Sequence, residues 1–309
     1  MGYKLAGYDV IGNVEIDPRV LNIYKNNLHP KYPYLMDVRD FLKQPNEDLP
    51  EDLFALDILD GSPPCSVFSS AGEREKGWNK EKKFREGQAM QKLDDLFFFF
   101  IQIAAKLKPR VVIAENVAGL IRGAARGYVN EIFKAFAEAG YVPQLFLLNA
   151  ATMGVPQARE RVFFVAHRAD LAYAKLKMAF AKPPILFGEI RSEKGVPLAP
   201  DSQAYELMKN RAPSDRKLSD ITKRLFGRAS GYTNCIWSDN QVAGTITSGG
   251  SCYRMYDGCG CTKQDFVNMQ TFPQDYDFGD QSVQYVCGMS VPPVMMAHIA
   301  REVYEQWLK

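Results

Sequence analysis

Long apolar runs are missing from this sequence, and so is a signal-peptide pattern at its start. A membrane-spanning helix needs about 20 consecutive apolar residues, whereas the apolar run at residues 96–103 is far shorter. The 6 cysteines form no regular framework in a chain of 309 residues, which argues against a secreted, disulfide-bonded scaffold. These absences predict a cytoplasmic protein that does not bind membranes.

A strong net charge is also absent, because 38 Lys and Arg residues against 36 Asp and Glu residues give a formal charge of +2. Such a total does not by itself indicate nucleic acid as a partner. The basic residues are unevenly distributed, with one excess between Gly72 and Gly87 and another between Lys209 and Arg228. Either segment could contact phosphates or be a solvated surface, so charge alone leaves the partner open.

Length and periodicity predict the fold class. A chain of this length can form a large core and two unequal domains. Residues 97–107 have a helical pattern before the strand-like run 111–114, and residues 128–139 have one before the run 145–148. This alternation predicts an α/β fold with a doubly wound, mostly parallel sheet. After Pro183-Pro184 the periodicity weakens, which predicts a second, smaller domain.

The segment Pro63-Pro64-Cys65-Ser66 follows the mostly apolar run 54–59. In open α/β sheets, ligands bind beyond the carboxyl ends of the strands, so a thiol in this loop would face that edge. The two prolines fix φ and prevent a helix before Cys65. Cys65 is therefore a candidate nucleophile, although an isolated cysteine at a strand end is more often a buried packing residue.

Two further charged motifs lie beside predicted strands. Glu115-Asn116-Val117 ends the apolar run that starts at Val111, and Gln157-Ala158-Arg159-Glu160 leads into the run that starts at Arg161. A carboxylate and two guanidinium groups at strand edges could converge on the thiol as an active site. Taken singly, Glu115-Asn116 could cap a helix and Arg159-Glu160-Arg161 could form an exposed charged turn.

Together, these motifs resemble those of the C5-cytosine DNA methyltransferase family in order and approximate spacing. The resemblance extends over residues 5–308. It includes three later segments, Gly244-Thr245-Ile246-Thr247, Gln270-Thr271-Phe272-Pro273 and Gly288-Met289-Ser290-Val291-Pro292-Pro293. The chain departs from the family at Met289, where an asparagine is usual.

The resemblance implies a Rossmann-like, S-adenosylmethionine-dependent enzyme. It would be a DNA (cytosine-5)-methyltransferase that transfers a methyl group to carbon 5 of a flipped-out cytosine. Cys65 would add to carbon 6 of the ring, and Glu115 would contact N3 and the exocyclic amine. Arg159 and Arg161 would hold the ring oxygen, the nucleotide backbone and the catalytic loop, for which residues 73–86 are the candidate.

The resemblance also implies a set of cofactor-binding residues. Glu15 would hold the ribose hydroxyls of S-adenosylmethionine, as acidic residues at strand ends do in dinucleotide folds. Ile16 and Leu96 would lie against the two sides of the adenine, and Asp37 and Val38 would meet its amine and ring. The complete expected set is Glu15, Ile16, Asp37, Val38, Pro64, Leu96 and Ser290.

The chain departs from the family at its beginning. Family members start with a strand and a Phe-x-Gly-x-Gly-Gly loop, whereas Met1 to Gly7 resembles the helix that follows that loop. A missing central strand would leave unpaired edges inside the sheet. We therefore expect a start codon placed too late or a truncated gene. A DNA-binding remnant with impaired catalysis is an alternative, and an RNA methyltransferase is disfavoured because the Cys-Phe-Thr tripeptide of that branch is absent.

The expected organisation is a catalytic and cofactor domain at 1–182, a target-recognition domain at 183–285 and a returning helix at 286–309. Double-stranded DNA is the expected partner of a monomer, with a restriction endonuclease of the same system as a candidate second partner. The recognition sequence cannot be read from one chain, because a few side chains set it. The cysteines at 252, 259 and 261 lack the paired spacing of common zinc modules, so we expect no metal site.

Overall fold

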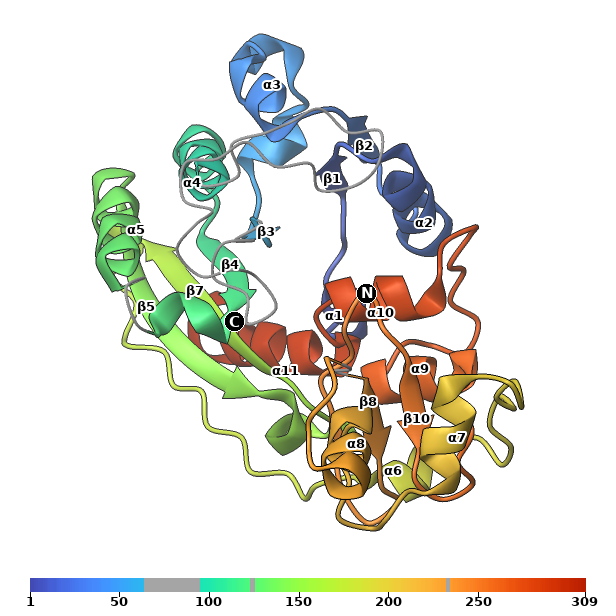
Figure 1. Cartoon of the computed structure of the whole chain (residues 1–309). Helices are drawn as coiled ribbons and strands as arrows, with labels where there is room; N and C mark the ends of the chain where they lie inside the picture. The colour runs from blue at the N-terminus through green and yellow to red at the C-terminus, as the bar shows by residue number, and fades with distance from the viewer. Residues whose placement is uncertain (64–94, 123–125, 232–233) are drawn as a thin grey trace.

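A computed structural model describes residues 1–63, 95–122, 126–231 and 234–309 of the chain (Figure 1). Pro64, Cys65 and the charged segment 73–86 lie outside the described residues. The predictions made for them stay predictions.

A four-stranded sheet forms the centre of the larger part of the molecule. Its order is β3 (Ile58–Gly61), β4 (Val111–Val117), β7 (Glu160–Arg168) and β5 (Tyr141–Asn149). β3 and β4 are parallel, and β7 runs antiparallel to both of its neighbours. All the strands of this sheet except β7 therefore point the same way, which confirms the predicted α/β class with a mostly parallel sheet.

Helices cover both faces of this sheet (Figure 1). On one face α4 (Leu96–Leu107) and α5 (Arg126–Glu138) cover Val112 and Ala114, and on the other α11 (Pro293–Val303) covers the intervening residues of β4. Successive side chains of a strand point to opposite faces, so one apolar run supplies both cores. The predicted helices before β4 and β5 are confirmed to within two residues.

The predicted strand after residue 54 is shorter than its apolar run. Residues Glu51–Phe54 form a 3₁₀ helix with Leu53 buried, and β3 begins only at Ile58. Pro50 precedes this helix and presets its entry, since proline is favoured where a helix begins. The apolar pattern alone does not show where the 3₁₀ helix ends and where the strand begins.

β1 (Gly12–Glu15) and β2 (Tyr32–Leu35) form a separate parallel sheet. They are joined by α2 (Pro18–Leu28), and α3 (Val38–Lys43) follows β2. The carboxylate of Asp17 caps α2 by accepting the N–H of Arg19 at 2.9 Å. The carboxylate of Asp37 caps α3 by accepting the N–H of Arg39 at 2.8 Å. Each cap lies two residues after its strand and starts a helix at the same edge of the sheet.

Two further hydrophobic cores are formed by residues between Phe187 and Cys287, and this region is called the second unit. Its elements are α6 (Phe187–Ile190), α7 (Gln203–Lys209), α8 (Leu218–Phe226), β8 (Cys235–Trp237), β9 (Ala243–Gly244), β10 (Cys252–Arg254), α9 (Lys263–Gln270) and α10 (Val283–Met289). The remaining short elements are α1 (Gly2–Leu5), β6 (Gln157–Ala158), 3₁₀ turns at Asn46–Asp48, Ala118–Ile121, Ala150–Met153 and Ala169–Leu171, and a π-helical turn at Tyr304–Leu308. β6 pairs with β9 and so joins the second unit to the first.

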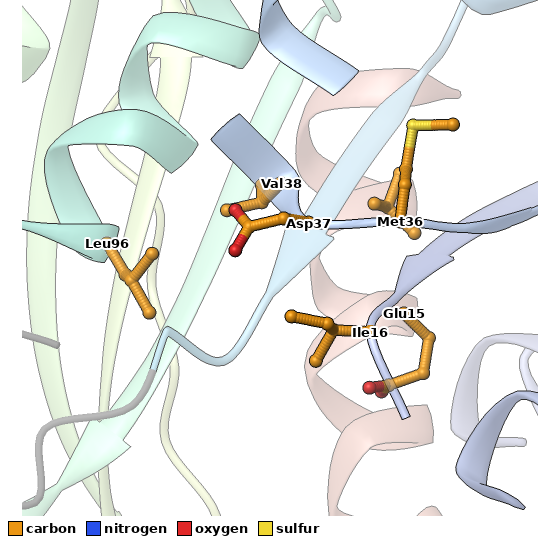
Figure 2. A pocket seen from close by; sticks show the side chains of 7 residues that line it. Glu15, Ile16, Met36, Asp37, Val38 and Leu96 are labelled. Carbon is orange, nitrogen blue, oxygen red and sulfur yellow. The ribbon is translucent and has the colours of Figure 1, made fainter. Parts of the chain in front are cut away.

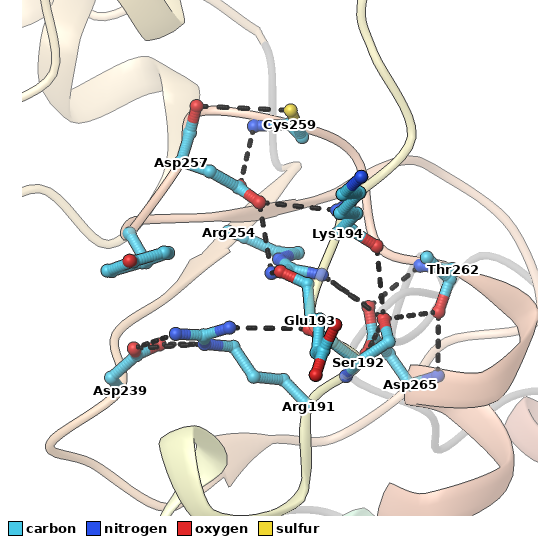
Figure 3. A network of polar contacts seen from close by, with 12 residues as sticks. Arg191, Ser192, Glu193, Lys194, Asp239, Arg254, Asp257, Cys259, Thr262 and Asp265 are labelled. Atoms are coloured by element: carbon cyan, nitrogen blue, oxygen red, sulfur yellow. Dashed lines mark hydrogen bonds and ion pairs between the residues drawn. The ribbon is translucent and has the colours of Figure 1, made fainter.

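A buried ion network holds the start of the second unit in place (Figure 3). Arg254 is fully buried and contacts the carboxylates of Asp257 at 2.9 Å and Asp265 at 3.6 Å. Asp265 in turn accepts the backbone N–H of Ser192 at 2.7 Å. Buried charges are tolerated when they are paired and hydrogen-bonded. The network ties β10 and α9 to the segment that enters the unit.

Two cysteines of the second unit, Cys252 and Cys287, are buried, and Cys235, Cys259 and Cys261 are partly exposed. Cys235 and Cys252 are register partners on β8 and β10, and burial raises the pKa of Cys252 to about 12. A thiol that stays protonated is a poor metal ligand. Within the described ranges, no group of three or more His, Cys, Asp or Glu side chains is arranged to hold a metal ion. None of the helices described there is long and apolar enough to cross a membrane.

Candidate active site

Glu115 and Arg161 form an ion pair at the ends of adjacent strands. Arg161 stands opposite Val117 in the antiparallel register of β4 and β7, two residues from Glu115. Its Nε lies 2.9 Å from the Glu115 carboxylate, and the two side chains are only 14% and 13% exposed. The pair therefore excludes both a helix-capping role for Glu115 and an exposed turn at Arg161.

The surroundings of Glu115 favour its protonated form. Burial raises the pKa of Glu115, and the charges of Arg161 and Arg159 and a hydrogen bond from Ser62 oppose the rise. Desolvation is the larger effect, since it disfavours the charged carboxylate. Glu115 can thus bind a proton closer to neutral pH than an exposed glutamate, as a group that donates a proton must.

Asn116 fixes the chain that leads toward Cys65. Its Nδ2 donates to the carbonyl of Pro63 at 3.1 Å, and its Oδ1 accepts the N–H of Val117 at 2.9 Å. Asn116 is buried, so both bonds are shielded from water. Ser62 and Pro63 are therefore held beside Glu115. Cys65 follows Pro63 by two residues in the sequence.

The Arg159 guanidinium bonds backbone carbonyls of the second unit. It is 2% exposed and donates to the carbonyls of Ile246 at 3.2 Å and Gly288 at 2.9 Å. Burial lowers the pKa of Arg159, and the nearby Arg161 lowers it further. Its buried Nε has no hydrogen-bond partner among the described residues. The exposed-turn alternative is wrong for this residue as well.

Two buried glutamine side chains, which the sequence did not mark as functional, complete the junction. Gln157 accepts the N–H of Ile246 at 3.1 Å and donates to Gln270 at 2.6 Å. Gln270 donates to the carbonyl of Ser290 at 2.7 Å. A fully satisfied buried amide network fixes one arrangement of its elements. The only sign of this network in the sequence was that Gln157 and Gln270 each lie in a motif of the family resemblance.

A cavity of about 140 Å³ lies at the carboxyl ends of β1 and β2 (Figure 2). Figure 2 shows Leu96 on one side of it and Glu15 and Ile16 on the other. The complete lining is Val14, Glu15, Ile16, Met36, Asp37, Val38 and Leu96. The structure thus brings together the expected cofactor residues of three separate segments.

Hydrogen bonds orient the two carboxylates of this cavity. Glu15 accepts the N–H of Asp17 at 2.8 Å. Asp37 accepts from the Arg39 guanidinium at 2.6 and 2.9 Å, and this contact lowers the pKa of Asp37. Both side chains therefore present acceptor oxygens, Asp37 as an ionised carboxylate.

The residues present fit the nucleoside half of S-adenosylmethionine. Ile16, Val38 and Leu96 supply apolar walls for a flat ring, and Glu15 supplies the strand-end carboxylate that suits ribose hydroxyls. Ser290 does not line this cavity, because it caps the end of α10. Its assignment, like that of Pro64, stays a prediction.

A second cavity, of about 630 Å³, extends from the nucleoside site to the segment beside Glu115. It shares Val14, Val38 and Leu96 with the first cavity and reaches Ser62 and Pro63. The segment that leads to Cys65 therefore borders the same open space as the nucleoside site.

Comparisons with known proteins agree with this geometry. A family model described as C-5 cytosine-specific DNA methylase matches residues 1–305. The chain is 33% identical over 186 residues to the Type II methyltransferase M.NgoPII of Neisseria gonorrhoeae, covering 59% of this chain and 47% of that protein. It is 28% identical over 243 residues to M.XorII of Xanthomonas oryzae pv. oryzae, covering 75% and 49%. The chain thus spans about half the length of these curated relatives.

Solved structures share the fold over nearly the whole chain. A protein described as a DNA modification methyltransferase from an E. coli prophage superposes with a TM-score of 0.69 at 18% identity, covering 100% of this chain and 95% of that one. A DNMT2 mutant of Spodoptera frugiperda superposes with a TM-score of 0.62 at 16% identity, covering 98% and 95%. At such identities the likeness shows the fold.

Proposed function

We propose that this chain, which belongs to the C-5 cytosine-specific DNA methylase family, is a DNA (cytosine-5)-methyltransferase. The observation that carries the proposal is the buried ion pair between Glu115 and Arg161, formed beside the Ser62-Pro63 segment that leads to Cys65. A carboxyl of raised pKa and a thiol, which the sequence supplies two residues after Pro63, are the groups that addition to a cytosine ring requires.

Each residue has a defined role in this proposal. The Cys65 thiolate forms a bond to carbon 6 of a cytosine turned out of the duplex, and the electrons of the carbon 5 to carbon 6 double bond move toward carbon 5. Glu115 supplies a proton at N3, and Arg161 orients Glu115. Once carbon 5 carries the methyl group that the bound cofactor would supply, water takes the carbon 5 proton, the electrons of that C–H bond re-form the double bond, and the sulfur leaves carbon 6 as a thiolate while N3 returns its proton to Glu115.

Arg159 is proposed as a positioning residue. Its bonds to the carbonyls of Ile246 and Gly288 hold the second unit against the sheet that carries Glu115. We propose that Glu15, Ile16, Asp37, Val38 and Leu96 bind S-adenosylmethionine, which supplies an electrophilic methyl group when bound. The apolar walls exclude water from the ring, and Glu15 fixes the ribose.

Residues 183–285 are proposed to recognise the DNA target, as one of three parts with 1–182 and 286–309. Arg216, Lys217, Lys223 and Arg228 are exposed on and around α8, where they can meet phosphates. Phosphate contacts position a protein on DNA without reading its sequence. Arg211 instead donates to backbone carbonyls of the second unit, so its role is structural.

We propose a cytoplasmic monomer as the working form, and a restriction endonuclease of the same system as its functional counterpart. The names of the Type II methyltransferase relatives support the second point.

Transfer of radiolabelled methyl groups from S-adenosylmethionine to mixed-sequence duplex DNA tests the proposal, with RNA as the parallel substrate. We expect label on DNA at carbon 5 of cytosine, and its loss with Cys65→Ala. Label on RNA alone would replace the proposed substrate. Absence of label on both, from a folded chain that binds S-adenosylmethionine, would contradict the proposed activity.

A further inference from the structure

The last turn of α2 contacts the loop that precedes α10 in the second unit (Figure 1). Asn27 donates to the carbonyl of Asp277 at 2.8 Å and accepts the backbone N–H of the same residue at 2.9 Å. Its amide group also donates to the carbonyl of Ile23 within α2 at 2.7 Å. One asparagine side chain thus bonds both backbone groups of a residue 250 positions away, which fixes the orientation of the two segments as well as their distance.

The carboxylate of Asp277 adds a second link to the same helix. Asn26 donates to one of its oxygens at 2.7 Å, and the N–H of Gly279 donates to the other at 2.8 Å. The hydrogen bonds from Gly279 and Asn26 lower the pKa of Asp277, so this carboxyl is ionised at neutral pH. Gly279 has a φ of +53°, which glycine adopts without strain. The loop therefore holds one charged acceptor in one place.

The first turn of α2 is fixed to the nucleoside cavity. Glu15, which lines that cavity, accepts the N–H of Asp17 at 2.8 Å. Asp17 is buried and caps the helix by accepting the N–H of Arg19 at 2.9 Å. An α-helix rises about 1.5 Å per residue, so the 11 residues of α2 connect the two contacts over about 15 Å. A shift of the last turn therefore moves the cap and the carboxylate beside it.

Three aromatic rings hold the loop on the side of the second unit. Tyr276 and Phe278 flank Asp277 in the sequence. Their ring centroids lie 4.4 and 5.4 Å from that of the buried Phe272, and 4.9 Å from each other. Phe272 follows Gln270, a member of the buried glutamine network, by two residues. The loop is thus attached to the junction beside the candidate active site.

The contact between α2 and the loop is better suited to positioning than to holding the fold together. Asn26 and Asp277 are exposed, and hydrogen bonds between exposed groups contribute little to stability because water competes for both partners. Their geometry is nevertheless specific, since the two asparagines make three bonds to one residue.

We propose that Asn26, Asn27 and Asp277 are positioning residues for the cofactor site. Their bonds hold α2 against the second unit and thereby hold the carboxylate of Glu15 in the orientation that binds the ribose of S-adenosylmethionine. Coupling between two sites is reciprocal, so a bound cofactor that orders α2 also orders the loop at 276–279. This inference rests on the proposed function.

An exchange of charge between Asn26 and Asp277 tests the proposal in chain 1–309. Asn26→Asp places two carboxylates at the 2.7 Å contact, and their repulsion opens it. Asp277→Asn in that background restores the hydrogen bond with donor and acceptor exchanged, and its side-chain oxygen can still accept from Gly279. The double variant therefore separates loss of the contact from loss of either side chain.

Calorimetric titration with S-adenosylhomocysteine measures the cofactor site without turnover. We expect Asn26→Asp to weaken binding about fivefold, as loss of a hydrogen bond with added repulsion predicts, and the double variant to recover to within about twofold. High salt should reduce the loss, since it screens exposed charges. The matched control is Asn210→Asp, which adds the same charge at the end of α7, where the side chain donates to the carbonyl of Glu206. It should leave binding unchanged.

Hydrogen exchange without ligand shows whether the effect reaches the cavity. We expect faster exchange in Asn26→Asp at residues 14–17 as well as at 276–279, and reversal of both in the double variant. Faster exchange confined to 23–28 and 276–279 would overturn the proposal, because the contact would then be local.

The calorimetric outcomes separate this inference from the proposed function. Equal affinity of Asn26→Asp and the unaltered chain, or a loss that the double variant does not recover, would overturn this inference alone. If the unaltered chain does not bind S-adenosylhomocysteine, the cofactor assignment of the proposed function fails, and this inference fails with it.

Discussion

Glu115 is subject to two opposing effects that both come from its place at the end of β4. Burial drives its carboxyl toward the neutral form, and the guanidinium of Arg161 at 2.9 Å favours the charged form. Because burial is the larger effect, the pKa of Glu115 is raised and its carboxyl holds a proton at higher pH than an exposed glutamate does, as a general acid requires.

Replacement of this carboxyl separates catalysis from binding. We expect Glu115→Gln to slow methyl transfer by about 100-fold or more, since a general acid typically contributes that much. DNA affinity, measured by electrophoretic mobility shift, should change far less. The matched control is Glu138→Gln, which removes an exposed carboxylate that pairs loosely with Lys134 at 3.9 Å. Equal losses of rate and DNA affinity in Glu115→Gln would remove the catalytic role.

Asp60, at the end of β3, provides a test of the structure that depends on pH. Asp60 is solvent-exposed beside the large cavity and accepts a hydrogen bond from the Tyr3 hydroxyl at 2.8 Å, and partial desolvation of its carboxylate raises its pKa from 3.8 to about 6. The folded state therefore holds this proton more tightly than the unfolded state. The free energy of unfolding therefore falls as pH rises from about 4 to about 6, and it stays lower by the full amount above pH 6.

We expect Asp60→Asn to raise the free energy of unfolding at pH 8 by about 1 kcal/mol, allowing for water in the cavity, and to change it little at pH 4. Urea denaturation at the two pH values measures the difference. Asp170→Asn is the control, because its contact with Arg168 lowers the pKa of that exposed carboxyl and predicts no gain at pH 8. A pH-independent effect of Asp60→Asn would contradict the raised pKa.

At the scale of elements, the second unit depends on one buried cation. Arg254 joins β10, the loop after it and α9 through Asp257 and Asp265. Removing one partner of a buried pair leaves the other charge uncompensated, and the cost is about 3–5 kcal/mol.

We expect Arg254→Met to destabilise the second unit by about that amount. Faster hydrogen exchange at 191–195 and 252–265, with little change in β4 and β7, would show that the effect is local. Arg216→Met, which changes an exposed arginine, should alter stability by less than about 0.5 kcal/mol. Similar exchange rates in the two variants would mean that the network does not hold the unit.

The sequence predicted the elements best where the apolar pattern was long. Residues 97–107 and 111–114 were recognised because a helix and a fully buried strand leave distinct patterns over such lengths. The run 54–59 was predicted less well, because its first residue, Phe54, ends a 3₁₀ turn and the strand begins only at Ile58.

Side-chain partners were predicted less well than elements. The pairing of Glu115 with Arg161 follows from β7 lying antiparallel to β4, which a doubly wound parallel pattern does not foretell. Arg159 bonds carbonyls 87 and 129 residues away, and no local pattern encodes contacts of that range. Five of the predicted cofactor residues line one cavity, because each lies at a strand end or a helix start, and their role in binding stays a prediction.

At the scale of the whole molecule, three junctions bring distant parts of the chain to one place. β6 and β9 pair, the Gln157–Gln270 relay ties the later motifs to the sheet, and α11 covers the face opposite α4. The candidate site therefore lies where the sheet meets the second unit. A substrate as large as a DNA duplex can contact both at once.

The most direct test of the account is a covalent complex between Cys65 and a cytosine analogue. Duplex DNA with 5-fluorocytosine is incubated with the chain and S-adenosylmethionine, and the denatured mixture is analysed by mass spectrometry. We predict an adduct of one protein with one DNA strand, attached at Cys65 and absent with Cys65→Ala. An adduct that persists in Cys65→Ala, or attachment at another cysteine of the folded chain, would contradict the assignment of the nucleophile.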